Sequence, residues 1–217
     1  MGDRLMLVAI VDDGVNTDLF PVGPLRYDMI VTENARVRPR KEDERITTPH
    51  GTIVAAIICK YAPDAEICSI KIFSGEILKT TCDALIAALK WCGKMKIPVI
   101  NLSLGTIDPD DFKRVNRVTD KLLKKGCAIV AACNNNGSYT LPAMHPGVLG
   151  VCASAELLDN QYIMNPPGEE VRFAASSRHT LTFRDGSIFQ TRFSNSYAAP
   201  TITAAYINGE LSGRCFR

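Results

Sequence analysis

The sequence predicts an α/β fold in which helices flank a mostly parallel sheet. Short continuous apolar runs, which are typical of strands buried on both faces, alternate along the chain with amphipathic stretches. Strands that alternate with helices in one domain favour parallel pairing. The 217 residues, 46% of them hydrophobic, are enough for one sizeable core, so we expect a single domain over residues 1–217.

Five apolar segments predict the strands of this sheet, at residues 5–11, 66–72, 99–102, 128–133 and 148–153. Four other stretches predict helices, at residues 50–60, 80–93, 110–125 and 196–207. One face of the second helix is apolar, and Gly93 is expected to end it. The third has acids in its first turn and lysines in its last, as the helix dipole favours. Near the end of the chain, Asp185-Gly186 between two short runs predicts a hairpin.

Charge and composition exclude several classes of function. The net charge of +2 gives no reason to expect nucleic acid or an anionic membrane as a partner, and no apolar run approaches the ~18 residues of a membrane-spanning helix. The most charged segment, residues 36–45, mixes both signs and is expected to be a solvated loop. The first residues do not resemble a secretory signal, because their apolar part is short and is followed directly by Asp12 and Asp13.

None of the eight cysteines forms a C-x-x-C pair, so we expect buried, reduced thiols in a cytoplasmic protein.

Three polar residues stand where an α/β fold places an active site, at strand ends and helix starts. Asp12 follows the apolar run V-A-I-V, His50 opens the first predicted helix, and Ser196 opens the last. Taken singly, each has an ordinary structural interpretation: a turn, a hydrogen-bonding histidine and a helix cap. The chain has only three histidines; His145 is followed by a proline, and His179 lies in a polar segment. His50 is therefore the best candidate for a base near neutral pH.

Six short sequence motifs occur in the same order as in a known protein family. V-D-D-G at 11–14, H-G-T-I-V-A at 50–55 and N-S-Y-A-A-P at 195–200 carry the Asp, the His and the Ser. Between them stand I-N-L-S-L-G at 100–105, V-A-A-C-N-N-N-G at 130–137 and L-P-A-M-H-P-G-V-L-G-V-C-A at 141–153. In wording and in the order Asp, His, Ser, the chain resembles the subtilisin-like serine proteases, the subtilases. The resemblance covers nearly the whole chain and implies the three-layer subtilisin-like fold and serine endopeptidase activity.

The resemblance also implies a role for each catalytic residue. Ser196 would be the nucleophile, and His50 would take its proton and later give it to the leaving amine. Asp12 would hold the imidazole tautomer and stabilise the imidazolium. The oxyanion would be bound by the backbone N–H of Ser196 and the side-chain amide of Asn135.

The substrate site is implied by the same words. Ser103, Leu104 and Gly105 would pair with the main chain of an extended peptide. Asn134 stands where the family usually has glycine, so it leaves the register of the oxyanion donor open between Asn134 and Asn135 and places polarity near the primary pocket. In the segment 74–76, Glu76 either attracts a basic residue of the substrate or is simply an exposed loop acid.

Three neighbours of the catalytic residues carry further expectations. Asp13 is expected to be exposed or to form a local turn. Ser194 and Asn195 replace the usual Gly-Thr, and Asn195 either contacts the oxyanion or caps the helix. Pro200 is expected near the opening turn of the helix, where a missing N–H costs least.

We expect no cofactor and no metal, because no run of calcium ligands stands out. The chain is expected to be a short form of the family that lacks signal and pro-segment, which leaves a regulatory or activating protein partner open. The expected substrate is a peptide or protein, with maturation of a specific precursor peptide as one role and general intracellular turnover as the rival. Two other classes stay open: an inactive subtilase fold that binds peptides or subunits, and a metal hydrolase built on Asp12, Asp13 and His50.

Overall fold

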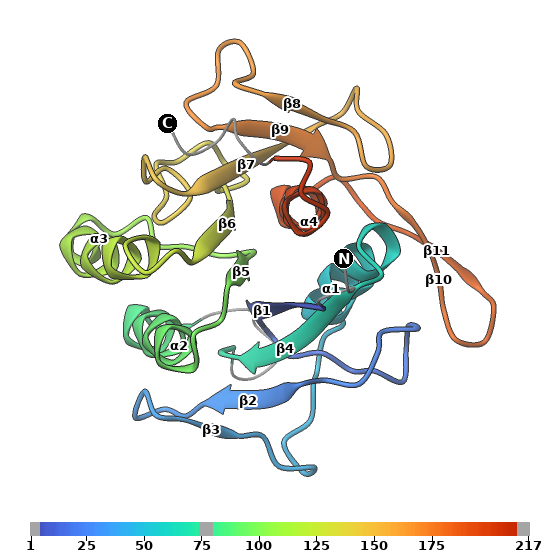
Figure 1. The fold of residues 1–217 in the computed structure, drawn as a ribbon, viewed down its shortest axis with the longest axis horizontal. Helices are drawn as coiled ribbons and strands as arrows, with labels where there is room; N and C mark the ends of the chain where they lie inside the picture. The colour runs from blue at the N-terminus through green and yellow to red at the C-terminus, as the bar shows by residue number, and fades with distance from the viewer. Residues whose placement is uncertain (1–4, 74–79, 212–217) are drawn as a thin grey trace.

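The chain forms three layers, with a sheet between two pairs of helices (Figure 1). The structure is a computed structural model that describes residues 5–73 and 80–211. Helices α2 (Cys82–Met95) and α3 (Pro109–Leu123) lie on one face of the sheet, and α1 (His50–Tyr61) and α4 (Asn195–Ile207) lie on the other. The predicted three-layer α/β fold is confirmed.

The main sheet is parallel except at its edges. Its strands follow the order β3-β2-β4-β1-β5-β6-β7-β9-β8, and the two edge strands β3 and β8 run antiparallel to their neighbours. The central β1 pairs with β4 and β5, and β5 pairs with β6, all in parallel. The carboxyl ends of β1, β5 and β6 therefore lie side by side at one end of the sheet. The strand bounds are β1 (Met6–Asp12), β2 (Tyr27–Val31), β3 (Val37–Pro39), β4 (Ala65–Lys71), β5 (Val99–Leu102), β6 (Ala128–Ala132), β7 (Leu149–Ser154), β8 (Tyr162–Met164) and β9 (Phe173–Ser176).

Alternate residues of the central strand face the two helix layers. Val8 and Ile10 belong to the core beneath α1, whereas Ala9 and Val11 belong to the core beneath α2 and α3. All four are buried. Burial on both faces is the reason why this strand reads as a continuous apolar run, and the removal of that surface from water holds the layers together.

Helix α2 ends later than its glycine signal indicated. It begins after Thr81, whose hydroxyl accepts a main-chain N–H of the first turn, and it ends before Lys96, which takes the left-handed conformation (φ 56°). The expectation that Gly93 ends the helix is therefore wrong. Gly93 lies where α3 approaches most closely, and a Cβ there would come within 2.9 Å of Leu122 Cδ2. Because glycine has no Cβ, Gly93 allows α2 and α3 to pack closely, and it does not cap the helix.

Four strands that the sequence did not predict, β2, β3, β8 and β9, extend the sheet at its two sides. Each has three to five residues, and in β2, β3 and β8 most side chains are only half-buried or exposed, so these segments lack the fully buried character that marked the equally short β5. Strand β3 lies within the charged segment 36–45, which is therefore not simply the solvated loop expected. Arg38 pairs with Glu44 at 2.5 Å and Arg40 with Asp28 of β2 at 2.6 Å, so opposite charges neutralise one another along this edge.

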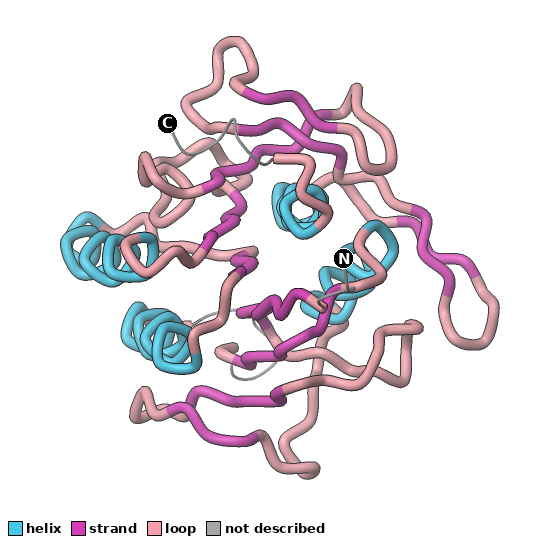
Figure 2. The backbone as a smooth tube through the Cα atoms, viewed as in Figure 1, coloured by secondary structure: helices cyan, strands magenta, loops and turns pink. Residues whose placement is uncertain are grey.

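A hairpin of β10 (Thr180–Thr182) and β11 (Ile188–Gln190) projects beyond α1, away from the main sheet (Figure 2). Its turn contains Gly186 in the left-handed region (φ 87°), so the predicted hairpin is confirmed. Phe183 anchors it by stacking on Phe20, with 4.5 Å between ring centroids.

Across the described ranges, no helix is both long enough and apolar enough to cross a membrane.

A methyl group at Gly150 of β7 is expected to destabilise the fold. The new Cβ would collide with the main-chain carbonyl oxygen of Ala143, and neither strand nor loop backbone can yield cheaply. We expect Gly150→Ala to lower the free energy of unfolding by about 3 kcal/mol in a urea titration. Gly23→Ala is the matched control, because nothing lies within 4 Å of a Cβ built there. Equal stability of the two variants would contradict the packing of this strand.

Candidate active site

The candidate residues meet at the carboxyl end of the central strands. Asp12 is the last residue of β1, Ser103 follows the end of β5, and Asn134 follows the end of β6 by two residues. His50 is the first residue of α1 and Ser196 is the second residue of α4. The parallel register thus brings together residues that are up to 184 positions apart, since 196 minus 12 is 184.

Asp12 and His50 form a direct hydrogen bond. The distance from His50 Nδ1 to Asp12 Oδ1 is 2.8 Å, and the aspartate is fully buried. A carboxylate can only accept, so the histidine Nδ1–H is the donor and the lone pair of the neutral ring lies on Nε2. The same Asp12 oxygen also accepts the N–H of Asp13 at 2.9 Å, which helps to hold the carboxylate in place.

The surroundings of His50 favour its protonated form. Burial lowers the pKa of His50, but the charge of Asp12, its hydrogen bond and the charge of Asp13 together raise that pKa above its usual value of 6.5. The ring of Tyr197 lies against the imidazole, with 5.3 Å between centroids. The positive charge that His50 acquires on protonation is therefore stabilised by the two carboxylates.

Ser196 lies in the same cleft as His50. The cleft has a volume of about 340 Å³, and its wall includes both residues. Ser196 Oγ donates to the carbonyl oxygen of Ser103 at 3.4 Å, and no hydrogen bond to His50 is formed within the described part of the chain. The contact to Ser103 is long and weak, so rotation about the Cα–Cβ bond of Ser196 frees the hydroxyl at little cost.

The main chain of Ser196 is held by a buried polar chain. Ser103 Oγ donates to the Ser196 carbonyl at 3.3 Å, Asn101 Nδ2 donates to Ser103 Oγ at 3.4 Å, and Thr203 Oγ1 donates to Asn101 Oδ1 at 2.7 Å. Pro200 lies inside the helix at its sixth residue, so its expected place in the opening turn is wrong. A residue at this position would ordinarily donate its N–H to the carbonyl four residues earlier, which is that of Ser196. Proline leaves this carbonyl free for Ser103.

Asn135 borders the cleft with its side-chain orientation fixed. Its Oδ1 accepts the N–H of Asn195 at 2.9 Å, which leaves Nδ2 as a donor without a protein partner among the described residues. The Ser196 N–H donates to Ser194 Oγ at 3.3 Å. That bond is long, so a stronger acceptor in the cleft can compete for this N–H.

Asn195 takes neither of its two expected roles. Ser194 is the N-cap of α4. The side chain of Asn195 accepts the N–H of Ala153 at 2.7 Å and donates to the carbonyl oxygens of Cys133 and Asn134 at 3.2 and 3.1 Å. It therefore ties the start of α4, which carries Ser196, to the loop after β6.

The predicted substrate residues line the same cleft. Ser103, Leu104, Gly105 and Asn134 are all among its lining residues. A Cβ at Gly105 would come within 2.5 Å of the Leu141 carbonyl oxygen, so the segment 103–105 packs directly on the neighbouring loop. The segment 74–76, with its candidate Glu76, lies outside the described residues.

One further expectation is corrected. Asp13 is not exposed: it is 1% accessible and accepts the N–H of Gly51 at 2.6 Å. His179 lies in a loop as expected, but its side chain is 2% accessible, and its Nε2 donates to the carbonyl of Tyr197 at 2.9 Å. In both cases the polar character of the residue hid its burial, because each side chain is satisfied by partners distant in sequence.

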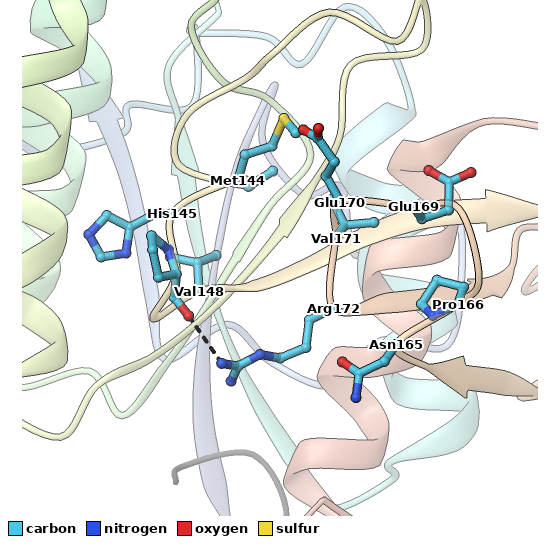
Figure 3. Close-up of a pocket in the computed structure, with 11 residues that line it drawn as sticks. Met144, His145, Val148, Asn165, Pro166, Glu169, Glu170, Val171 and Arg172 are labelled. Atoms are coloured by element: carbon cyan, nitrogen blue, oxygen red, sulfur yellow. Dashed lines mark hydrogen bonds between the residues drawn. The ribbon is translucent and has the colours of Figure 1, made fainter.

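Another hollow, of about 380 Å³, lies at the amino ends of β7 and β9 and contains none of the candidate residues (Figure 3). There Arg172 reaches across from the start of β9 and donates to the carbonyl of Pro146 at 3.1 Å. In the described part of the chain, no group of three or more histidine, cysteine or acidic side chains could hold a metal ion.

The seven cysteines that the structure describes are free thiols. Burial raises the pKa of Cys133, which borders the cleft, to about 12, so this thiol stays protonated at neutral pH.

An Asp-His pair that shares a cleft with a helix-opening serine suggests comparison with serine hydrolases. The model of the subtilase family matches residues 3–208. The chain belongs to the subtilase family. This subtilase is 24% identical over 209 residues to an alkaline protease of Alkalihalobacillus alcalophilus, covering 91% of the chain and 52% of the relative. It is 23% identical over 216 residues to the major intracellular serine protease of Bacillus subtilis strain 168, covering 91% and 66%. The chain thus spans about half the length of the first of these relatives.

Solved structures agree with the fold. The prenylagaramide maturation protease PagA superposes with a TM-score of 0.66 at 21% identity, covering 94% of this subtilase and 74% of PagA. The protease domain of PatA superposes with a TM-score of 0.68 at 21% identity, covering 95% and 79%. The epidermin leader peptide processing protease of Staphylococcus aureus superposes with a TM-score of 0.65 at 16% identity, covering 93% and 64%. At these identities the likeness shows the shared fold.

The titration of His50 tests the geometry of this subtilase site. We expect a pKa above 6.5 for His50 by NMR, and a fall below the wild-type value in Asp12→Asn, because burial would then be less opposed. With a folded-state pKa above the unfolded one, the pair stabilises the fold fully below pH 6.5 and loses this contribution as the pH rises through the folded pKa. An unchanged pKa in Asp12→Asn would contradict the 2.8 Å contact.

Proposed function

We propose that this subtilase is a serine endopeptidase that uses Asp12, His50 and Ser196 as a triad. The observation that carries the proposal is the 2.8 Å bond between Asp12 and His50 beside a cleft that also contains Ser196. Its relatives and neighbours are proteases by name, which supports the same activity here.

In the first step, the Ser196 hydroxyl turns from the Ser103 carbonyl to His50 Nε2 and attacks the scissile carbonyl carbon of the peptide. His50 takes the proton as the C–O bond forms, and the imidazolium is stabilised by Asp12. The proton then passes to the leaving amine, and the C–N bond breaks. Water repeats the sequence on the acyl-enzyme and releases the acid.

Two N–H groups would donate hydrogen bonds to the negatively charged oxygen of the tetrahedral intermediate. Asn135 Nδ2 is one, since its oxygen is already tied to Asn195. The Ser196 N–H is the other, since its present bond to Ser194 is long. Both belong to the amino end of α4 or are held against it, where the helix dipole favours an anion.

The substrate of this site is an extended peptide. Ser103 to Gly105 offers main-chain groups along one side of the cleft, so backbone pairing would supply affinity and the neighbouring pocket would select side chains. We propose maturation of a precursor peptide as the role. The neighbours PagA and the epidermin leader peptide processing protease are named for such processing, which supports this role over general turnover.

A fluorophosphonate probe tests the nucleophile. We expect the wild-type protein to be labelled and Ser196→Ala to be unlabelled, because only an activated serine reacts with the probe. Ser187→Ala, in the distant hairpin turn, is the matched control and should label like the wild type. An unlabelled wild type that binds peptides would favour the inactive binding module, and chelator-sensitive hydrolysis without labelling would favour a metal hydrolase.

Replacement of the oxyanion donor should reduce kcat and leave KM nearly unchanged. We expect Asn135→Leu to cost about 10²–10³ in kcat, a magnitude that comes from a subtilisin and not from this structure. Asn134→Leu is the comparison, since it changes the adjacent residue of the same loop. A larger loss of kcat in Asn134→Leu than in Asn135→Leu would overturn the assignment by one residue.

A further inference from the structure

Asp13 is a buried carboxylate that the triad does not use. It follows Asp12 directly, yet it is 1% accessible and points toward the first turn of α1. Its Oδ1 accepts the N–H of Gly51 at 2.6 Å, and its Oδ2 accepts the N–H of His50 at 3.3 Å and the hydroxyl of Thr48. These two N–H groups are among the four that every helix leaves without an internal partner.

Helix α1 has no cap of its own. The residue before it is Pro49, whose side chain makes no capping hydrogen bond. The carboxylate of Asp13 takes that place from the end of another element, strand β1. The negative charge also complements the positive end of the helix dipole.

The fit is close enough to constrain the residues around it. A Cβ at Gly51 would come within 2.8 Å of Asp13 Oδ1 and 2.6 Å of the Gly14 carbonyl oxygen, so glycine is needed for the contact. On the far side, Lys71 of β4 donates its Nζ to the Asp13 carbonyl at 3.3 Å. The carboxylate is therefore held between a strand end and a helix start, with little freedom to move.

We propose that Asp13 is a positioning residue for His50, which fixes the helix turn that carries the imidazole and supplies a second negative charge near it. The inference rests on the proposed protease function, since it gives His50 the part of the base. Asp13 touches no reacting atom, so it acts through His50. The charge matters most when His50 is an imidazolium, which is the state that forms during attack.

The titratable groups around His50 come from three elements. Asp12 ends β1 and Asp13 follows it, Lys71 lies on β4, and Tyr197 of α4 lies against the ring. Burial and the charge of Asp12 raise the pKa of Asp13, whereas the hydrogen bonds from Thr48 and Gly51 and the charge of His50 lower it. Of these groups only the two aspartates raise the pKa of His50.

Two substitutions separate the capping contribution from the charge. Asparagine is a good N-cap residue, so Asp13→Asn keeps an acceptor for the helix and removes the charge, whereas Asp13→Ala removes both. We expect Asp13→Asn to move the acid limb of the pH profile of kcat/KM to lower pH and to reduce kcat about tenfold at its plateau. Asp13→Ala should show the same shift and, in addition, a lower Tm. Thr48→Val, which leaves the charge in place, should keep the acid limb of the wild type.

The pKa of His50 measured by NMR in a Ser196→Ala background gives a readout without activity. A lower value in Asp13→Asn supports the proposal even if the protein hydrolyses no peptide, so failure of the protease function is distinguishable. An unmoved acid limb and an unmoved pKa of His50, with only Tm reduced, would show a purely structural cap and overturn the proposal. Asp13→Ser repeats the comparison if Asp13→Asn does not fold. If neither folds, Asp13 is required for folding itself, and the positioning role is rejected.

Discussion

The parallel register of β1, β5 and β6 is the constraint on which the site depends. It places three strand ends next to one another. The residues that follow β5 and β6 line one cleft, and Asp12 at the end of β1 bonds His50, which lines it too. On the α1–α4 side of the sheet, two helices begin at this same end, so His50 and Ser196 enter the cleft from helix amino-termini. Asp12, His50 and Ser196 lie far apart in sequence, and they meet because each stands at or next to the end of a strand or helix.

This arrangement removes several charged side chains from water, which is energetically unfavourable. Asp12, Asp13 and Lys71 are all nearly inaccessible, and an ion out of water is expensive unless it is paired and hydrogen-bonded. Here each carboxylate accepts at least two hydrogen bonds, from main-chain N–H groups, a hydroxyl or the imidazole. Asp12 Oδ2 is buried without a hydrogen-bond partner among the described residues, and most donors to the other carboxylate oxygens belong to the backbone. That is a fixed source of donors and keeps the imidazole oriented before any substrate arrives.

The sequence predicted the features that follow from local pattern. The long buried strands, the four helices and the hairpin turn at Gly186 carry period or turn signals, and the words around Asp12, His50 and Ser196 agreed with the family. The outer strands β2, β3, β8 and β9 were missed; they are short, and in β2, β3 and β8 most side chains are only half-buried or exposed. The burial of Asp13 was missed because nothing near it in sequence shows that Thr48 and Gly51 will come to meet its carboxylate. Charge alone suggests exposure, and only tertiary contact reverses that.

Pro200 was expected in the opening turn of α4, but it lies further inside the helix and has a different role. In the sixth position of α4 it removes a hydrogen bond, which a helix would normally avoid. The carbonyl that loses its partner is that of Ser196, and Ser103, itself held by Asn101, supplies the replacement from the wall of the cleft. The helix bond is thus exchanged for one that links Ser196, the proposed nucleophile, to the segment expected to pair with the substrate. Ser103 makes two contacts with Ser196: its hydroxyl donates to the Ser196 carbonyl, and its carbonyl accepts the resting Ser196 hydroxyl. The two serines therefore define each other's positions, and Pro200 leaves the Ser196 carbonyl free for the first of these contacts.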